Sequence, residues 1–269
     1  TPHYMWRLCI SPVNRVELTK HTLRLITENN LAVETIHMLI LRKSEERGRA
    51  NHGWLNSYHT FSFANYRDPN QMGFRSLRVI NEDRVAGGAG FGTHSHQEME
   101  IISYIIEGAL EHQDSLGTKA VMHAGEVQRM TAGTGITHSE YNHSDSEPVH
   151  FLQIWIPPAQ KALTPSYEQQ QFTDAEKRGT LRLLVSPDGR DRSLTIHQDT
   201  YLYATILSAG DRIQHPLAPD RHAWVQVVKG TVLVNNTPLE TGDGAAIGRE
   251  EKVAIEATSD AELILFDLA

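Results

Sequence analysis

The sequence predicts an all-β protein made of two stacked jelly-roll barrels, and three observations support this. Apolar strand patterns of about five to eight residues recur along the chain, glycine-rich turns separate them, and no long helical pattern interrupts them. In addition, landmarks of the first half return in the second half. Short strands joined by tight turns are typical of a barrel or a double-sheet jelly roll, and the repeat indicates two of them.

The repeat is visible around two pairs of glycines. QVVKGTVLV around Gly230 resembles YIIEGALEH around Gly108, and TGDGAAI around Gly242 resembles AGEVQRM around Gly125. An internal duplication explains both matches and the β-rich character of both halves.

The domain organisation follows from where strand patterns begin and end. The pattern MLILR begins at Met38, whereas residues 1–37 keep neither the strand period nor the helix period, so we expect them to form an N-terminal extension outside the domain. We expect a first domain over residues 38–158 and a second over 181–269. Residues 159–180 are polar and contain proline, which predicts a linker with one short helix.

Each expected strand has its own pattern of apolar residues and its own turn. In the first half, an aromatic alternation ends at the turn Asp68, Pro69 and Asn70, and the glycine run 87–92 precedes the strand that carries two histidines. That glycine run does not resemble a nucleotide-binding loop, because no helical pattern and no GK[ST] follow it. Further β-rich segments are expected at 76–85, 101–108, 109–117, 121–142, 150–158, 181–190, 193–199, 200–211, 222–235 and 242–268.

Composition excludes several classes of protein. The 269 residues carry a formal net charge of −8, with a sequence pI of about 6.0, whereas nucleic-acid binding needs a basic face. No apolar run is long enough for a membrane span, and no basic segment precedes an apolar signal core, so we expect a cytoplasmic protein. The single cysteine, Cys9, excludes an intramolecular disulfide and a thiolate metal cluster.

Four side chains in the first half have the spacing of a metal site. His94 and His96 lie two residues apart, as do His138 and Glu140, and residues two apart share one face of a strand. Antiparallel pairing of the two strands would bring three imidazoles and one carboxylate to one point. A lone HxH is weak in a chain with 15 histidines, but this nitrogen and oxygen set suits a catalytic first-row metal ion.

The second copy provides a control, since it lacks all four candidate ligands. Counting from the matched glycines, without allowing for gaps, the equivalent positions are Pro216, Ala218, Ile255 and Ala257. The fold therefore does not require these residues, and the first copy carries them for another reason.

Longer segments resemble a known family. The segment from Gly88 through HSH to Glu100 is similar to the first cupin motif, and GTGITHSEYN (133–142) is similar to the second. Together with HTFSFANYRDP (59–69) and VSPDGRDRSL (185–194), they resemble the pirin family, and within it the bacterial pirin-like quercetin 2,3-dioxygenases, over residues 38–269. The sequence departs from the expected pattern at Gly133, where many cupins have proline, and at Arg192, where a glycine is expected.

The resemblance implies a bicupin with one metal ion in its N-terminal cupin domain. The implied ligands are His94, His96, His138 and Glu140, and the second cupin domain has none. One divalent transition metal ion is implied, with iron first and copper, manganese, nickel, cobalt or zinc as alternatives. Glu100 matches an optional glutamate of the cupin motif, and we expect it beside the ligands or on the surface rather than on the metal.

The resemblance further implies a metal-dependent dioxygenase that cleaves flavonols such as quercetin at the 2,3-bond, with release of carbon monoxide. Its partners are a flavonol and dioxygen, with neither nucleic acid nor membrane. Glu140 is the expected proton acceptor for the flavonol 3-hydroxyl, although a carboxylate bound to a dication is a weak base. The alternative is a non-enzymatic, metal-binding and redox-sensing regulator that binds a protein partner; a structural module and a sugar isomerase agree less well with the sequence.

Other residues near the expected site have two interpretations. His112 belongs either beside the metal ligands or on the surface, and the surface is expected more often for a strand histidine. Phe91, Tyr104 and Trp155 line a flat aromatic pocket or belong to the core.

Overall fold

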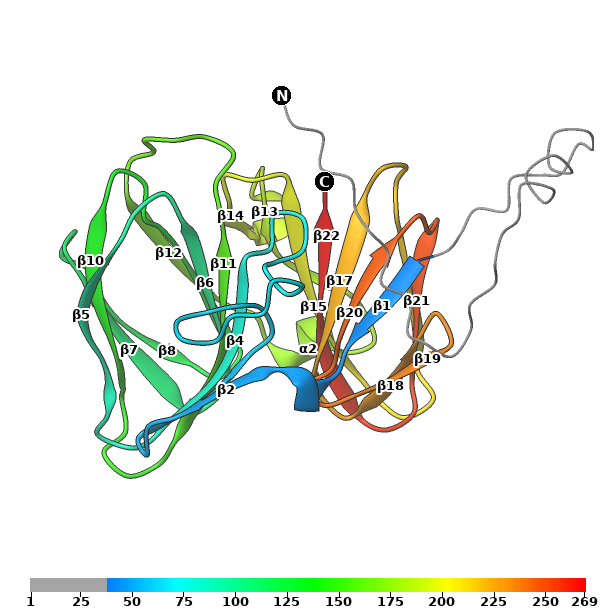
Figure 1. Ribbon diagram of the computed structural model, residues 1–269, viewed down its shortest axis with the longest axis horizontal. Coiled ribbons are helices and arrows are strands. Elements are labelled where there is room, and N and C mark those ends of the chain that lie inside the picture. Colours follow the sequence, from blue (N-terminus) through cyan, green and yellow to red (C-terminus); the bar gives the residue numbers. More distant parts are fainter. Residues whose placement is uncertain (1–37) are drawn as a thin grey trace, which may run out of the picture. The chain divides into compact units, whose positions relative to one another are not determined.

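The computed structural model describes residues 38–269, so the expected extension over residues 1–37 lies outside the described residues. Figure 1 shows two groups of strands, one from each half of the chain. The first half contains β1 (Met38–Arg42), β2 (Gly48–Asn51), β3 (Leu55–His59), β4 (Val79–Val85), β5 (Gly90–His96), β6 (Glu100–Glu107), β7 (Ala109–Asp114), β8 (Lys119–His123), β9 (Glu126–Thr131), β10 (Ile136–Asn142), β11 (Val149–Ile156) and β12 (Ser166–Gln171). The second half contains β13 (Arg182–Ser186), β14 (Leu194–Thr195), β15 (Thr200–Leu207), β16 (Arg212–Pro216), β17 (His222–Lys229), β18 (Thr231–Val234), β19 (Thr237–Glu240), β20 (Gly244–Gly248), β21 (Lys252–Ala257) and β22 (Ala261–Leu268).

Helices are short. The described residues hold α2 (Asp174–Lys177) and two 3-10 helices, η1 (Ser44–Glu46) and η2 (Arg190–Arg192). The Thr173 side chain caps α2 by accepting a hydrogen bond from the Glu176 N–H. Within residues 38–269, no helix is both long and apolar enough to cross a membrane.

The two halves have the same sheet order, which confirms the all-β prediction and the two cupin domains. In the first half, a seven-stranded sheet β12-β9-β6-β11-β4-β3-β2 faces a four-stranded sheet β5-β10-β7-β8. In the second half, the corresponding sheets are β1-β20-β17-β22-β15-β13-β14 and β16-β21-β18-β19. The matched glycines keep the same left-handed backbone, with φ of 78° at Gly108 and 81° at Gly230, and of 82° at Gly125 and 85° at Gly242.

The edge strands of the large sheets differ from the expected domain limits. β1, expected in the first domain, pairs with β20 in the second-half sheet, and β12, expected in the linker, pairs with β9 in the first-half sheet. Each strand occupies the equivalent edge and satisfies backbone groups that would otherwise be unpaired. Sheet membership therefore crosses the expected boundaries at residues 38 and 159–180.

The outer faces of the two large sheets pack against each other. Phe61 of the first half contacts Trp224 of the second, with ring centroids 4.9 Å apart, inside one apolar core shared by both halves. Tyr104 lies at this interface, where its hydroxyl donates to Glu262 and accepts from the Lys177 ammonium at 3.1 Å. One face of each large sheet thus joins the halves, while the other face lines the interior of its own barrel.

Candidate metal centre

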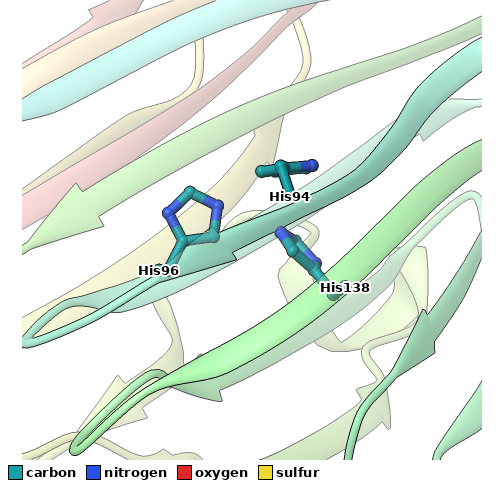
Figure 2. A group of neighbouring side chains, drawn as sticks. All are labelled: His94, His96 and His138. Carbon is teal, nitrogen blue, oxygen red and sulfur yellow. The ribbon is translucent and has the colours of Figure 1, made fainter.

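Three histidines converge inside the first barrel. His94 and His96 lie on β5 and His138 lies on β10, directly opposite His94 in the antiparallel register. Figure 2 shows the three rings gathered between the two strands. Their centroids are 4.5 Å (His94 to His138), 4.8 Å (His94 to His96) and 4.9 Å (His96 to His138) apart. One ring nitrogen of each lies within 4.8 Å of the others.

Hydrogen bonds orient two of these rings. His94 Nδ1 lies 2.8 Å from the Gly92 carbonyl, to which it donates, so its Nε2 is left with a free lone pair. Behind His138, His112 Nε2 lies 3.0 Å from the Asp114 carboxylate, and His112 Nδ1 lies 3.5 Å from His138 Nδ1. The Asp114 carboxylate accepts a hydrogen bond from His112 Nε2–H, so His112 Nδ1 carries a lone pair and acts as an acceptor. His138 Nδ1 then donates to His112 Nδ1, which leaves the lone pair of His138 on Nε2.

The electrostatics of the cluster keep His96 and His138 neutral. Burial, followed by the neighbouring imidazoles, lowers the pKa of His138 to about 2. Burial and His94 lower the pKa of His96 to about 4. Neutral imidazoles have the lone pairs that a metal ion needs, so both are ready to bind one at neutral pH.

Glu140 lies two residues after His138 and is 1% exposed. Its carboxyl group accepts hydrogen bonds from Gln153 Nε2 at 2.8 Å, Gln128 Nε2 at 3.2 Å and Ser103 Oγ at 3.5 Å. Burial raises its pKa to about 7, although the Gln153 hydrogen bond acts in the opposite direction. The register of β10 with β5 shifts between His138 and Glu140, and the carboxylate lies within 4.8 Å of ligand atoms of His138 and His112, in a set that does not include His94 and His96.

The residues present fit a divalent transition metal ion. His138 Nε2 is buried and has no hydrogen-bond partner among residues 38–269, as a nitrogen reserved for a metal would be. Three imidazoles with an adjacent carboxylate form a donor set suited to first-row metals.

A cavity of about 430 Å³ opens beside the histidines. Its aromatic wall includes Trp54, Phe91 and Trp155, and the Trp155 ring lies edge-on to His96 with centroids 4.9 Å apart. Phe91 and Trp155 therefore line the pocket, as one of the two interpretations expected. The pocket interpretation of Tyr104 is wrong, because its side chain faces the interface between the halves.

Two further expectations need correction. His112 is fully buried and contacts His138, so the surface interpretation is wrong. Glu100 is neither on the surface nor beside the histidines: it is fully buried and accepts hydrogen bonds from Thr131 Oγ1 at 3.0 Å and His197 Nδ1 at 3.0 Å. Its position follows from strand alternation, because Ser103 on β6 faces the barrel interior and Glu100 faces the other half.

The residues that hold Glu140 were not predicted from the sequence. Gln153, Gln128 and Ser103 come from three different strands, and their pairing register brings them together. A polar residue in the middle of the apolar run HFLQIWI was the available signal for Gln153.

The second barrel holds no candidate metal cluster among residues 38–269, since both clusters belong to the first half. Strand pairing places Val253 and Ile255 of β21 at the positions of His138 and Glu140, two residues before the positions counted from the glycines, and both are buried in an apolar core. His215 on β16 lies opposite Val253, as His94 lies opposite His138, and its Nε2 lies 2.8 Å from the Asp267 carboxylate. The expectation that the second copy lacks a histidine at the position of His94 is therefore wrong.

Comparisons with known proteins agree with the fold and the site. A family model described as Pirin matches residues 41–156, and one described as Quercetinase C-terminal cupin domain matches residues 183–268. Quercetin 2,3-dioxygenase of Escherichia coli strain K12 is 53% identical over 231 residues, which are 86% of this chain and 99% of that protein. This chain is therefore homologous to a quercetin 2,3-dioxygenase.

Two crystal structures are similar over the same range. YhhW from Escherichia coli superposes with a TM-score of 0.84 at 53% identity, covering 86% of this chain and 98% of that chain. Bacterial pirin YhhW in complex with nickel(II) superposes with a TM-score of 0.82 at 53% identity, covering 86% of this chain and 99% of that chain. The chain therefore belongs to the pirin family of bicupins and carries its histidine cluster in the first of its two cupin domains.

Proposed function

We propose that this protein is a metal-dependent dioxygenase that cleaves flavonols such as quercetin at the 2,3-bond and releases carbon monoxide. The observation that carries the proposal is the cluster of three histidines beside Glu140 at an aromatic cavity. The activity named for the relative at 53% identity supports the same reaction.

The proposed metal ligands are His94, His96, His138 and Glu140. The nickel(II) complex of the similar pirin supports a divalent ion, while iron as the native metal stays a prediction. A bound metal ion would supply Lewis acidity that lowers the pKa of the flavonol 3-hydroxyl and would bring substrate and dioxygen together.

The chain's own residues would bind the substrate and move its proton. Phe91 and Trp155 offer flat apolar faces to the rings and exclude water. Glu140, with its pKa raised to about 7, would accept the 3-hydroxyl proton. Gln153 and Gln128 hold its two carboxylate oxygens and thereby orient it. Because both oxygens have partners besides a metal, Glu140 would shift part of its coordination when it takes the proton.

The alternative function is a redox-sensing regulator that binds a protein partner. Such a regulator would use the same histidine cluster, so the cluster alone does not distinguish a regulator from a dioxygenase. The cavity of about 430 Å³ beside the histidines favours the enzyme, because a sensor has no need of a space the size of a small aromatic molecule. A protein partner and a cytoplasmic location stay predictions.

Aerobic quercetin turnover by protein reconstituted separately with iron(II), copper(II), manganese(II) and nickel(II) tests the proposal. We expect loss of flavonol absorbance and release of carbon monoxide with at least one metal. His94→Ala should weaken metal binding by at least about tenfold, whereas His143→Ala, which removes an exposed histidine, should change nothing. Stoichiometric metal binding without turnover would favour the regulator.

Replacing Glu140 separates its proposed role as proton acceptor from its proposed role as metal ligand. Glu140→Gln should lower kcat by about 10²–10⁴-fold while quercetin still binds to the metal-loaded protein. Full turnover by a metal-loaded Glu140→Gln variant would remove Glu140 as the proton acceptor.

A further inference from the structure

A row of polar side chains crosses the inner face of the large first-half sheet. Strand pairing places one residue beside the next on six neighbouring strands, from β3 through β4, β11, β6 and β9 to β12. The row is His59, Asn81, Gln153, Ser103, Gln128 and Gln169. A polar side chain buried on the inner face of a barrel sheet destabilises the fold unless it forms hydrogen bonds, so each residue of the row needs a hydrogen-bond partner.

In the middle of the row, the donor groups have partners. Gln153, Ser103 and Gln128 donate hydrogen bonds to Glu140. Gln169 donates to the Val121 carbonyl at 3.0 Å. One acceptor there, Gln128 Oε1, is buried without a partner among the described residues.

The end of the row on β3 and β4 does not have its partners. His59 Nδ1, Asn81 Oδ1 and Asp83 Oδ1 are buried and have no hydrogen-bond partner among the described residues. The three residues are 4%, 2% and 3% exposed, respectively, and Asp83 follows Asn81 by two residues on the same face of β4. Three unpaired polar atoms on one wall indicate a partner that comes from outside residues 38–269.

That wall belongs to the cavity beside the histidines. His59, Asn81 and Asp83 line the cavity together with His94, His96 and Glu140. The terminal torsions of histidine, asparagine and aspartate are broad, so a small rotation presents the unpaired atoms to a ligand. From Gln153 to His59 the row crosses two strand spacings, about 10 Å, which is the scale of a multi-ring aromatic molecule.

We infer that His59, Asn81 and Asp83 form a specificity wall that binds hydroxyl groups on the ring of an aromatic ligand remote from its metal-binding oxygen. This inference rests on the proposed function and names the substrate class, a polyhydroxylated aromatic. A phenolic hydroxyl both donates and accepts, which matches an amide, an imidazole and a carboxyl group placed side by side. A site built to hydrogen-bond hydroxyl groups disfavours analogues that lack them, because its own polar groups then stay unpaired.

Binding of two flavonols to nickel-loaded protein without oxygen tests the wall. Quercetin carries ring hydroxyls and 3-hydroxyflavone lacks them, while both keep the metal-binding oxygens. We expect the native protein to bind quercetin at least about tenfold more tightly, measured by calorimetry, and Asn81→Leu and Asp83→Leu each to reduce this ratio by about fivefold or more. Asn56→Leu, the same kind of change on the exposed face of β3, should leave the ratio unchanged.

Thermal unfolding without ligand separates recognition from packing. Because the native groups are unpaired, Asn81→Leu should keep or raise the melting temperature. If Asn81→Leu and Asp83→Leu fold poorly, Asp83→Asn keeps the shape and should still reduce the ratio. Equal affinity of the native protein for both flavonols, or an unchanged ratio in all three variants, would overturn the wall. If the native protein prefers quercetin but shows no turnover with any metal, the hydroxyl-binding role of the wall is supported and the proposed dioxygenase activity is contradicted.

Discussion

At the scale of single residues, the tautomer of His138, a proposed metal ligand, depends on groups behind it. Asp114 accepts backbone N–H bonds from Leu116 and Thr118, at 2.9 and 3.0 Å, which hold its carboxylate toward His112. His112 in turn contacts His138, the imidazole whose Nε2 has no partner among residues 38–269. The turn after β7 therefore sets the tautomer of a proposed ligand on β10.

Asp114→Asn should weaken metal binding without removing a ligand. An amide donates as well as accepts, so His112 would no longer be forced to keep its proton on Nε2, and His138 would not be held with a free Nε2. We expect the dissociation constant for nickel to rise by about 10–100-fold in competition with a chelator. Glu111→Gln, which removes an exposed carboxylate beside His143, is the control, and an equal effect in both variants would contradict the role of Asp114.

At the scale of elements, the loop between β9 and β10 positions the strand that carries His138 and Glu140. Gly133 adopts φ of +47°, its carbonyl accepts the Glu98 N–H at 2.9 Å, and the next N–H donates to the Leu163 carbonyl at 2.9 Å. Proline cannot adopt this backbone, since its ring holds φ near −65°. The departure from the cupin pattern at this position therefore has a conformational reason.

Gly133→Ala should destabilise the protein more than another glycine replacement at positive φ. A Cβ at Gly133 would collide with the Leu163 carbonyl, whereas at Gly117, with φ of +92°, nothing lies within 4 Å of it. We expect Gly117→Ala to lower the free energy of unfolding by about 1 kcal/mol and Gly133→Ala by about 2–3 kcal/mol in urea denaturation. Equal losses would show that the loop relaxes around the added methyl group.

At the scale of the whole molecule, the segment from Lys43 to Arg47 joins the two halves by ion pairs with buried carboxylates. The Lys43 ammonium and the Ser44 N–H each lie 2.8 Å from the Asp243 carboxylate of the second half. Arg47 Nη1 pairs with Glu82 of the first half at 2.9 Å. Glu82 also pairs with His150 at 3.0 Å, so His150 is buried rather than a surface histidine.

The free energy of unfolding should fall in acid through Glu82. Burial alone would raise the pKa of Glu82, but the His150 hydrogen bond and Arg47 outweigh it and lower the pKa from 4.5 to about 2. A carboxyl group with a lowered pKa stabilises the fold above its unfolded pKa, and this contribution is lost as pH falls from about 4.5 to about 2. The shift corresponds to at most about 3 kcal/mol.

Urea denaturation of the native protein and of Glu82→Gln at several pH values measures the pH-dependent contribution of Glu82 to the free energy of unfolding. The difference in free energy of unfolding should be about 3 kcal/mol near pH 7 and should close as the pH approaches 2. Glu256→Gln removes a surface partner of Arg212, and we expect no pH-dependent difference from it. A gap between native protein and Glu82→Gln that does not change with pH would mean that packing, not charge, explains the effect.

Local sequence patterns were sufficient to predict the fold class, the duplication and the convergence of three histidines. Strand alternation is a local property, so the two-residue spacing of His94 and His96 and the burial pattern of β10 follow from neighbouring residues alone. The matched glycines are equally local, because each needs a left-handed backbone at its own turn.

Which strands are neighbours could not be predicted from local patterns, because it depends on the folded chain. The exchange of β1 and β12 between sheet edges, the outward face of Glu100 and the burial of His112 all depend on pairings between distant residues. The row from His59 to Gln169 contains one residue from each of six strands, so the pattern of any single strand does not predict it. Local alternation sets which face a side chain takes, but the register between strands far apart in sequence sets what it meets there.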